Sequence, residues 1–414
     1  RYKLLGITDP FEPQAFPVRL WDVFGQAGHP VRATIEGMGS LLLARLLDLN
    51  ETQTGILAIV FKLAKEKNWP LIDLKDLQSL LKEVYDHASE YSAQYGNISK
   101  QSVGAIQRSL LVLEQEGADQ FFGEPALDLQ DFMQLDSSGR GYINILSATR
   151  LFNSPKLYST FLIWMLSRLF ETLPEVGDLE KPKFVFFFDE AHLLFNDASK
   201  LFLEKVEQVV RLIRSRGVGI YFITQNPQDL PESVLAQLGN RVQHALRAYT
   251  PKEMKAIKVA AQSFRPNPEF DTETVLTELG TGEALVSFLN EKGQPSVVER
   301  SYILSPQSSF DLLNESEQLA LITSSPFHQK YAVRVDNESA YEKLTEKSAR
   351  EEKEKEREEE DKARVAEEKA SQKRSPGRPR KSSLEKAKDS FISSLFRTIA
   401  REVAKLIMGS FKRK

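Results

Sequence analysis

The sequence predicts an α/β protein in which a parallel sheet is flanked by helices. Residues 184–188 are five apolar residues in a row, ended by Asp189 and Glu190. A second apolar run covers 219–224, and a helical pattern over 199–215 separates the two. Strands that are apolar on both faces and joined by helices are typical of a parallel sheet with helical layers.

The N-terminal region predicts a strand and then a helical insertion at about 37–135. Residues 15–24 form the strand, which ends at a glycine-rich turn. Asn50, followed three residues later by Gln53, predicts a capped helix start. Further helices are expected at 73–91 and 102–116.

The remaining elements follow in order along the chain. We expect a strand at 141–146 and a long apolar helix at 155–173. After the two central runs, a short helix at 231–238 leads to a third strand of the parallel sheet at 241–248. Residues 283–289 and 296–303 predict a closing pair of strands around a turn.

The C-terminal part has a different composition. Thirteen of the 14 residues at 351–364 are charged, which predicts either a solvated single helix or disorder. A linker rich in proline and glycine follows, and the last 30 residues show an amphipathic helical pattern. We therefore divide the chain into an α/β domain at 1–340, a charged linker at 341–383 and a basic helix at 384–414.

Charge and composition exclude several classes of protein. The net charge of -3 is the sum of +10 from residue 373 onward and -13 before it. The absence of cysteine excludes disulfides, thiolate metal sites and thiol nucleophiles. No apolar run approaches 18 residues, so we expect no transmembrane segment and a cytoplasmic location.

Polar residues directly follow the two central apolar runs. Asp189 and Glu190 end the first, and Gln225 follows the second. The carboxyl edge of an open α/β sheet is where ligands bind. An Asp there holds Mg²⁺ through water, a Glu polarises a water that attacks a phosphate, and a Gln bonds to both phosphate and water. The alternatives are a solvated acidic turn and a Gln that begins a turn.

Several basic residues and the histidines allow two interpretations each. Arg214 and Arg216 suit the negative end of a helix dipole, or they supply a finger to the nucleotide of a neighbouring subunit. Arg241 is a further candidate for contact with the nucleotide. The five histidines, His192 among them, show no metal-ligand spacing, and we interpret them as structural or surface residues.

Taken together, these motifs resemble a known superfamily. Phe184-Val-Phe-Phe-Phe-Asp189-Glu190-Ala-His192, with 209–217 and Thr224-Gln-Asn-Pro, is similar to the HerA/FtsK superfamily of RecA-like P-loop ATPases. Further segments narrow the resemblance to the bacterial HerA-like helicase/ATPase family, over about 1–345: 28–34, 95–99, 122–125, 239–247 and 279–285.

The resemblance implies a RecA-like fold that binds and hydrolyses ATP with Mg²⁺. It also implies a homo-oligomeric, hexameric ring and movement along DNA. By motif position, Asp189 organises the metal through water, Glu190 is the catalytic base, Gln225 is the sensor, and Arg214 stands where the superfamily has its finger.

One motif of the superfamily is missing from these residues. No Gly-x-x-x-x-Gly-Lys-Ser/Thr loop occurs, and the first residue is Arg1 rather than Met. That loop supplies the phosphate cradle, the phosphate lysine and a metal-binding hydroxyl. Either a preceding segment carries it or the protein has lost it. We expect residues 1–414 alone to bind ATP poorly and to be inactive.

The basic tail supports a function of another class. The segment 373–381 resembles an AT-hook, with Arg374, Arg378, Arg380 and Lys381 as DNA contacts. Pro376 stands where such hooks have Arg, which favours a basic spacer instead. The terminal helix is expected to pack on the body or a partner, or to lie on an anionic membrane. The alternative function is an inactive RecA-like scaffold that binds DNA or a partner through this tail.

Overall fold

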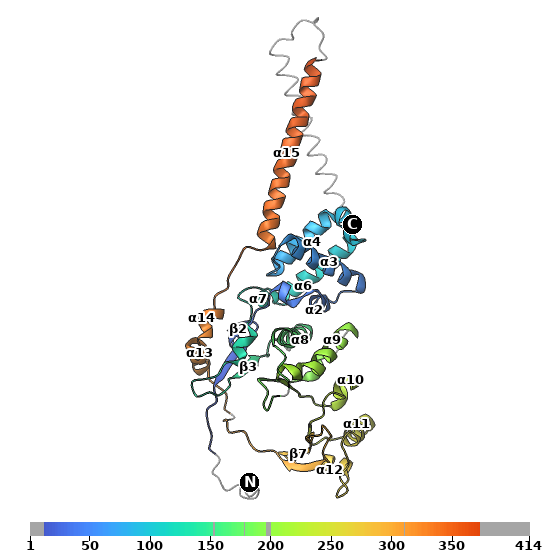
Figure 1. The fold of residues 1–414 in the computed structure, drawn as a ribbon, viewed down its shortest axis with the longest axis vertical. Coiled ribbons are helices and arrows are strands. Elements are labelled where there is room, and N and C mark those ends of the chain that lie inside the picture. The colour runs from blue at the N-terminus through green and yellow to red at the C-terminus, as the bar shows by residue number, and fades with distance from the viewer. Residues whose placement is uncertain (1–11, 152–153, 178, 196–199, 310, 373–414) are drawn as a thin grey trace. The chain divides into compact units, whose positions relative to one another are not determined.

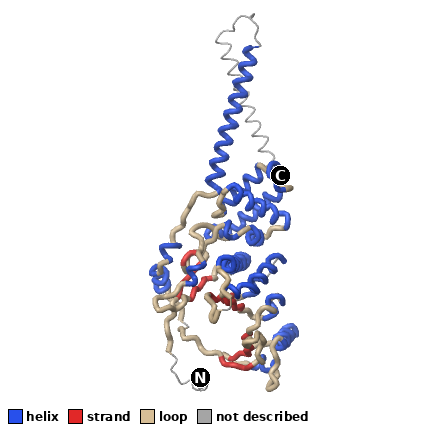
Figure 2. The backbone as a smooth tube through the Cα atoms, in the orientation of Figure 1, coloured by secondary structure: helices blue, strands red, loops and turns tan. Residues whose placement is uncertain are grey.

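The computed structural model describes residues 12–372, except 152–153, 178, 196–199 and 310 (Figure 1). The chain divides into two compact units, residues 1–346 and 347–414. The described residues of the first unit form two parallel sheets and one antiparallel sheet. Figure 2 shows these strands together with the helices. This architecture confirms the predicted α/β fold class with parallel strands, flanking helices and a helical insertion.

The first parallel sheet has the strand order β2–β1–β3. Its strands are β1 (Val18–Asp22), β2 (His29–Pro30) and β3 (Ile143–Ser147). All of β1 pairs with β3. Gly28 lies against β1, where a Cβ atom would be 2.5 Å from the backbone nitrogen of Trp21. Only glycine lets the loop approach the strand so closely.

A helical insertion joins β2 to β3. The capping box predicted at Asn50 is present: its side chain accepts from Gln53 N–H, and the Gln53 side chain accepts in return. The helix predicted at 73–91 is instead two helices, because the backbone leaves the helical region at His87. The helices are α1 (Ile35–Met38), α2 (Ser40–Leu46), α3 (Glu51–Lys67), α4 (Leu74–Asp86), α5 (Ala88–Tyr95), α6 (Lys100–Gln115) and α7 (Ala118–Phe121).

The second parallel sheet pairs β4 (Phe184–Phe188) with β5 (Val218–Phe222) in register along their full length. Before it comes α8 (Pro155–Thr172), and between the strands run α9 (Lys200–Leu212) and the one-turn helix η5 (Ile213–Arg216). This is the predicted strand–helix–strand unit. Gly217 ends η5 with φ +75 and turns the chain into β5.

The prediction that 184–188 is buried on both faces is wrong. Phe186 and Phe188 are buried in the main core, whereas Phe187 is 63% exposed. The Phe187 ring stacks on Tyr221 of β5, with centroids 4.6 Å apart. Successive residues of a strand point to opposite faces. Helices α8 and α9 contribute to the core that buries Phe186 and Phe188, and this accounts for one face.

The third sheet is antiparallel, with the order β6–β7–β8. The closing strand pair is present as β7 (Glu283–Ser287) and β8 (Glu299–Tyr302). With α11 (Pro251–Gln262) and α12 (Thr272–Glu278), this sheet surrounds a small core of its own. That core contains Ile257, Ala260, Phe264, Leu276, Leu279, Leu285 and Val298.

The third strand predicted for the parallel sheet is wrong in both partner and direction. β6 (Arg241–Gln243) is only three residues long and runs antiparallel to β7. The chain between β5 and β6 forms only the single turns η6 (Pro227–Asp229) and α10 (Glu232–Leu235). A parallel connection usually needs a full crossover helix, and these two turns do not supply one.

A C-terminal segment returns to the first sheet. It contains α13 (Glu315–Ser324) and α14 (Phe327–Tyr331). The Tyr331 hydroxyl donates to the buried carboxylate of Asp131, and Lys330 Nζ lies 2.7 Å from the same oxygen. Arg32 Nη1 donates to the Tyr331 carbonyl over 2.9 Å. The buried carboxylate of Asp131 is thereby paired with a cation, and the buried guanidinium of Arg32 has a hydrogen-bond acceptor. Pairing and hydrogen bonding lower the cost of burying charged groups.

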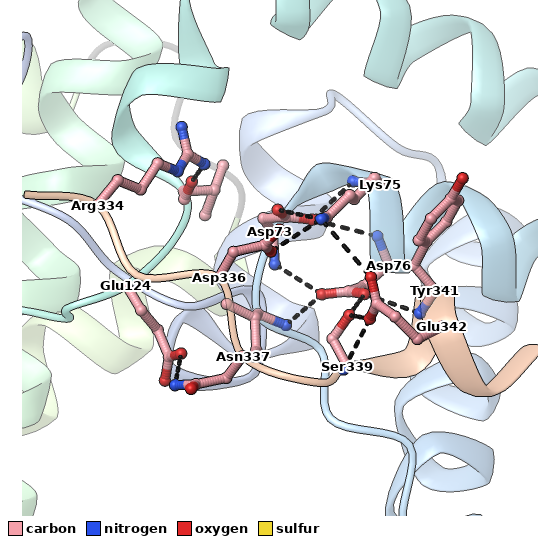
Figure 3. A network of polar contacts seen from close by, with 12 residues as sticks. Asp73, Lys75, Asp76, Glu124, Arg334, Asp336, Asn337, Ser339, Tyr341 and Glu342 are labelled. Atoms are coloured by element: carbon pink, nitrogen blue, oxygen red, sulfur yellow. Dashed lines mark hydrogen bonds and ion pairs between the residues drawn. The ribbon is translucent and has the colours of Figure 1, made fainter.

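The segment after α14 is fastened to the helical insertion by Asp76 (Figure 3). The Asp76 carboxylate is fully buried. It accepts hydrogen bonds from the backbone of Ile72 and Tyr341, at 2.8 and 2.9 Å, and from the Ser339 hydroxyl. Lys75 Nζ donates to Asp336 over 2.9 Å beside it. We call these contacts the Asp76 clasp.

The charged run 351–364 forms part of the helix α15 (Ala340–Gln372), so the solvated-helix interpretation holds over disorder. Pairs at i,i+4 support it, among them Lys347–Glu351 and Glu358–Lys362. The linker residues from 373 onward and the segment 384–414, predicted as a basic helix, lie outside the described residues. None of the described helices is both long and apolar enough to cross a membrane.

Candidate active site

The carboxyl ends of β4 and β5 meet at one edge of the second sheet. Ile223 follows β5 and bonds to both sides of the turn after β4: its N–H donates to the Phe188 carbonyl over 2.9 Å, and its carbonyl accepts from Ala191 N–H over 2.8 Å. Asp189 and Glu190 lie between these two bonds. The acidic pair is therefore held on a turn that is fixed to the sheet at both ends.

Glu190 has an unusual backbone conformation. Its φ of 48° and ψ of 48° fall in the left-handed region, which costs a residue with a Cβ atom about 1–2 kcal/mol. The other described non-glycine residues with positive φ are Asp48 and Asn68, types that tolerate this region. Glutamate is not one of the residue types that tolerate the left-handed region. Strain of this kind clusters at functional sites.

The Glu190 carboxylate has a polar partner on each side. Gln225 Nε2 donates to Oε1 over 3.2 Å, and His192 Nδ1 lies 3.3 Å from Oε2. The structure thus brings together Glu190 and Gln225, which are 35 residues apart in the chain. Asp189 directs Oδ1 back to the Glu190 N–H over 3.0 Å and is itself exposed.

Two residues at this edge were not found from the sequence. His192 was interpreted as structural, although its position two residues after Glu190 in a tight turn was the available signal. Tyr158 of α8 donates its hydroxyl to the Asp189 carbonyl over 2.8 Å. Burial, together with the charges of Asp189 and Glu190, raises the pKa of Tyr158 to about 12. Tyr158 therefore stays a neutral donor that holds the turn through the Asp189 carbonyl.

The predicted arginines lie in different surroundings. Arg214 is exposed on η5. Arg216 is held within its own chain: Nη1 donates to the Leu173 carbonyl, Nη2 lies 3.7 Å from Glu175, and the guanidinium is 5.0 Å from the centroid of the Phe170 ring. These contacts tie the end of η5 to the end of α8. A structural role accounts for Arg216 without a nucleotide.

Arg241 is not brought to the Glu190 cluster. It lies on β6 of the antiparallel sheet, where Nη1 donates to the Ser263 carbonyl over 2.7 Å. The four predicted DNA contacts lie outside the described residues: Arg374, Arg378, Arg380 and Lys381.

The donor set at this edge suits one part of a Mg²⁺–nucleotide site. Asp189 and Glu190 offer carboxylate oxygens, the hard ligands that Mg²⁺ prefers. Among the described residues, no three His, Cys, Asp or Glu side chains gather as a metal cage. Mg²⁺ usually binds through one or two carboxylates plus water and substrate phosphates. The edge fits the metal and water side of such a site, while a phosphate-loop motif does not occur in the 414 residues.

The fold and site define an α/β protein with a strained acidic turn at the carboxyl edge of parallel strands. The family model described as "Helicase HerA-like C-terminal" matches residues 1–414, and the chain belongs to this family. No curated protein matches the sequence.

Solved structures of the bacterial conjugative coupling protein TrwBdeltaN70 are similar in fold. The unbound monoclinic form is 11% identical, with a TM-score of 0.42, over 72% of this chain and 75% of that one. The trigonal form in complex with sulphate is also 11% identical over the same shares of the two chains, with a TM-score of 0.44.

Proposed function

We propose that this chain forms the hydrolytic part of a HerA-like motor ATPase that acts as a DNA helicase or translocase. The observation that carries the proposal is the contact between Glu190 and Gln225 at the carboxyl ends of paired parallel strands. Membership of the HerA-like family supports a P-loop ATPase class. The left-handed backbone of Glu190 supports a role in chemistry, because strain of this kind clusters at functional sites.

Each residue of the edge has a distinct part in this proposal. Glu190 accepts a proton from the attacking water at a carboxylate oxygen. Asp189, exposed beside it, binds Mg²⁺ through water. Bound Mg²⁺–ATP supplies the transferable phosphoryl group and the neutralising charge. Tyr158 keeps the turn in position through the Asp189 carbonyl.

Gln225 links the state of the nucleotide to Glu190. Its amide now donates to the Glu190 carboxylate. A γ-phosphate offers the same N–H groups several charged acceptor oxygens. Binding of ATP would therefore draw Gln225 away from Glu190, and loss of the phosphate would return it. The sensor role of Gln225 is therefore an exchange of its hydrogen bond between Glu190 and the γ-phosphate.

The proposal extends to an oligomer and to DNA. The exposed Arg214, on η5 directly before β5, is the candidate finger for a neighbouring subunit of a hexameric ring. The 414 residues contain no phosphate-loop motif, so in this proposal the phosphate cradle is supplied by another segment of the intact protein. We therefore expect the chain alone to bind ATP poorly and the intact protein to hydrolyse it.

The test is Glu190→Gln in the intact protein. Steady-state hydrolysis of Mg²⁺–ATP should fall by about 100-fold or more, because a positioned base contributes that much. ATP affinity, measured by calorimetry, should stay within about threefold, because the amide is isosteric with the carboxylate. Glu269→Gln, at an exposed loop position, is the matched control and should leave both unchanged. A Glu190→Gln protein that hydrolyses ATP at the wild-type rate contradicts the role.

The second candidate is a non-catalytic scaffold that binds DNA or a partner through the tail. The +10 charge from residue 373 onward and the absence of a phosphate-loop motif favour it. It would replace the first if the intact protein hydrolyses no ATP with or without DNA. DNA binding should then weaken, and its salt dependence should become shallower, when the four tail residues are changed to alanine. Those residues are Arg374, Arg378, Arg380 and Lys381.

A further inference from the structure

His192 lies in a rigid part of the turn after β4. It belongs to the one-turn helix η4 (Ala191–Leu194), whose first and last residues are buried in the main core. Ala191 N–H is bonded to the carbonyl after β5, and the His192 carbonyl accepts from Phe195 N–H over 3.0 Å. The backbone of His192 is thus fixed while its side chain remains half-buried beside Glu190.

The Nδ1 atom of His192 has an unfulfilled hydrogen-bonding capacity. It is buried, and it makes no aligned hydrogen bond to any residue that the structure describes. Glu190 Oε2 lies 3.3 Å away, so the distance suits a hydrogen bond but the direction does not. A buried polar atom left in this state costs free energy. A small rotation of the Glu190 side chain would satisfy it.

Gln225 holds the other oxygen of the same carboxylate. Its amide donates to Glu190 Oε1 over 3.2 Å and reaches Oε2 at 3.5 Å. The carboxylate therefore lies between the Gln225 amide, which donates to it, and the His192 ring, which makes no aligned hydrogen bond to it. When Gln225 turns to another acceptor, Glu190 loses its aligned partner. His192 Nδ1 is then positioned to replace it.

We propose that His192 is a positioning residue for Glu190. On release by Gln225, the His192 Nδ1–H bonds to Glu190 Oε2 and leaves Oε1 directed at the attacking water. The inference rests on the proposed function and deepens it. It requires the tautomer that carries the proton on Nδ1, with Nε2 unprotonated. His192 touches no reacting atom and acts only through Glu190.

The kinetic test compares two amides in the intact protein. His192→Asn puts an amide N–H near the Nδ1 position, whereas His192→Gln puts it near Nε2. We expect His192→Asn to keep kcat for ATP within about threefold, and His192→Gln and His192→Ala to lower it about 10-fold or more, with KM unchanged. His244→Asn, in the antiparallel sheet, is the matched control and should match the wild type.

The rescue pattern decides the outcome. Equal losses in His192→Asn and His192→Gln, or full activity in all three variants, would overturn the proposal. Thermal unfolding of each variant verifies that a loss of kcat is not a loss of fold.

A second measurement separates this inference from the proposed function. The chain has five histidines, so ¹⁵N-histidine labelling gives few ring signals to assign. We expect the Nδ1–H tautomer for His192 and a change in its Nδ1 shift in Glu190→Gln. An Nε2–H tautomer that ignores Glu190→Gln overturns the contact whatever the ATPase activity. A wild-type protein without ATPase activity overturns the proposed function, whatever the tautomer is.

Discussion

The two parallel sheets each carry an aspartate at the end of a strand, and they use it differently. Asp22, the last residue of β1, is buried and accepts three backbone hydrogen bonds from the following loop, at 2.8 to 3.0 Å. Asp189, directly after β4, is exposed and accepts from its neighbour Glu190. The Asp22 carboxylate is occupied by the backbone hydrogen bonds that shape the loop. The Asp189 carboxylate retains oxygens that face solvent. A carboxylate at the end of a strand is available for catalysis only where backbone N–H groups do not already bond to its oxygens.

Removal of the buried Asp22 carboxylate should have the greatest effect on stability. Asp22→Ala would leave three loop N–H groups without their acceptor, and we expect a loss of about 2–4 kcal/mol in unfolding free energy. Asp189→Ala should change stability by less than about 1 kcal/mol, because the group is exposed. Urea denaturation measures both. Asp22→Asn keeps one acceptor oxygen and should fall between them, and similar losses at Asp22 and Asp189 would contradict the comparison.

A somewhat smaller effect should appear as pH dependence in the first sheet. Burial, with the nearby charges of His328 and Arg19, lowers the pKa of His29 from 6.5 to about 4. The folded state therefore favours neutral His29, and its full stability is present above pH 6.5. As the pH falls below 6.5 the unfolded state binds a proton that the folded state refuses, so stability falls until about pH 4.

Between pH 7.5 and 5, this group should contribute a loss of about 2 kcal/mol. The matched variant is His29→Phe, which keeps an aromatic ring beside Trp21 without a titrating group. Urea unfolding at both pH values should show a smaller difference in the variant than in the wild type. An unchanged difference would mean that other groups set the acid sensitivity.

A more modest change in stability is expected at Glu190, beside the second sheet. Glu190→Gly should stabilise the protein by about 1 kcal/mol, because glycine adopts the left-handed conformation without strain. Glu190→Ala keeps the strain and should give no such gain. Thermal unfolding measures both, and ATP hydrolysis should be lost in both. A stabilisation that is equal in the two variants would indicate that the carboxylate, not the backbone, is the source of the strain.

The part of the site that the sequence predicts is the part that strand direction determines. Glu190 and Gln225 meet because the ends of adjacent parallel strands share an edge. Tyr158 could not be predicted, because its approach to the Asp189 carbonyl depends on how α8 packs across the sheet. The sequence places His192 two residues after Glu190, but the approach of its ring to the Glu190 carboxylate depends on the direction of a side chain in a tight turn.

The fold shows the same division between local and tertiary information. Local signals predicted the capping box at Asn50. They left the charged run at 351–364 as either a solvated helix or disorder, and the structure has the helix. The predicted direction of β6 was wrong, because the direction depends on which partner strand is within reach after two single-turn helices. The exposure of Phe187 depends likewise on what covers each face of β4.

The Asp76 clasp has a consequence for the order in which the chain matures on the ribosome. The Ser339 hydroxyl that bonds to Asp76 comes 263 residues later in the sequence. At about 5–20 residues per second, synthesis of that stretch takes on the order of tens of seconds. Throughout this interval the Asp76 carboxylate lacks its hydrogen bonds from Ser339 and Tyr341. The insertion therefore gains its last buried contacts only after the 263 residues that follow Asp76 have been synthesised.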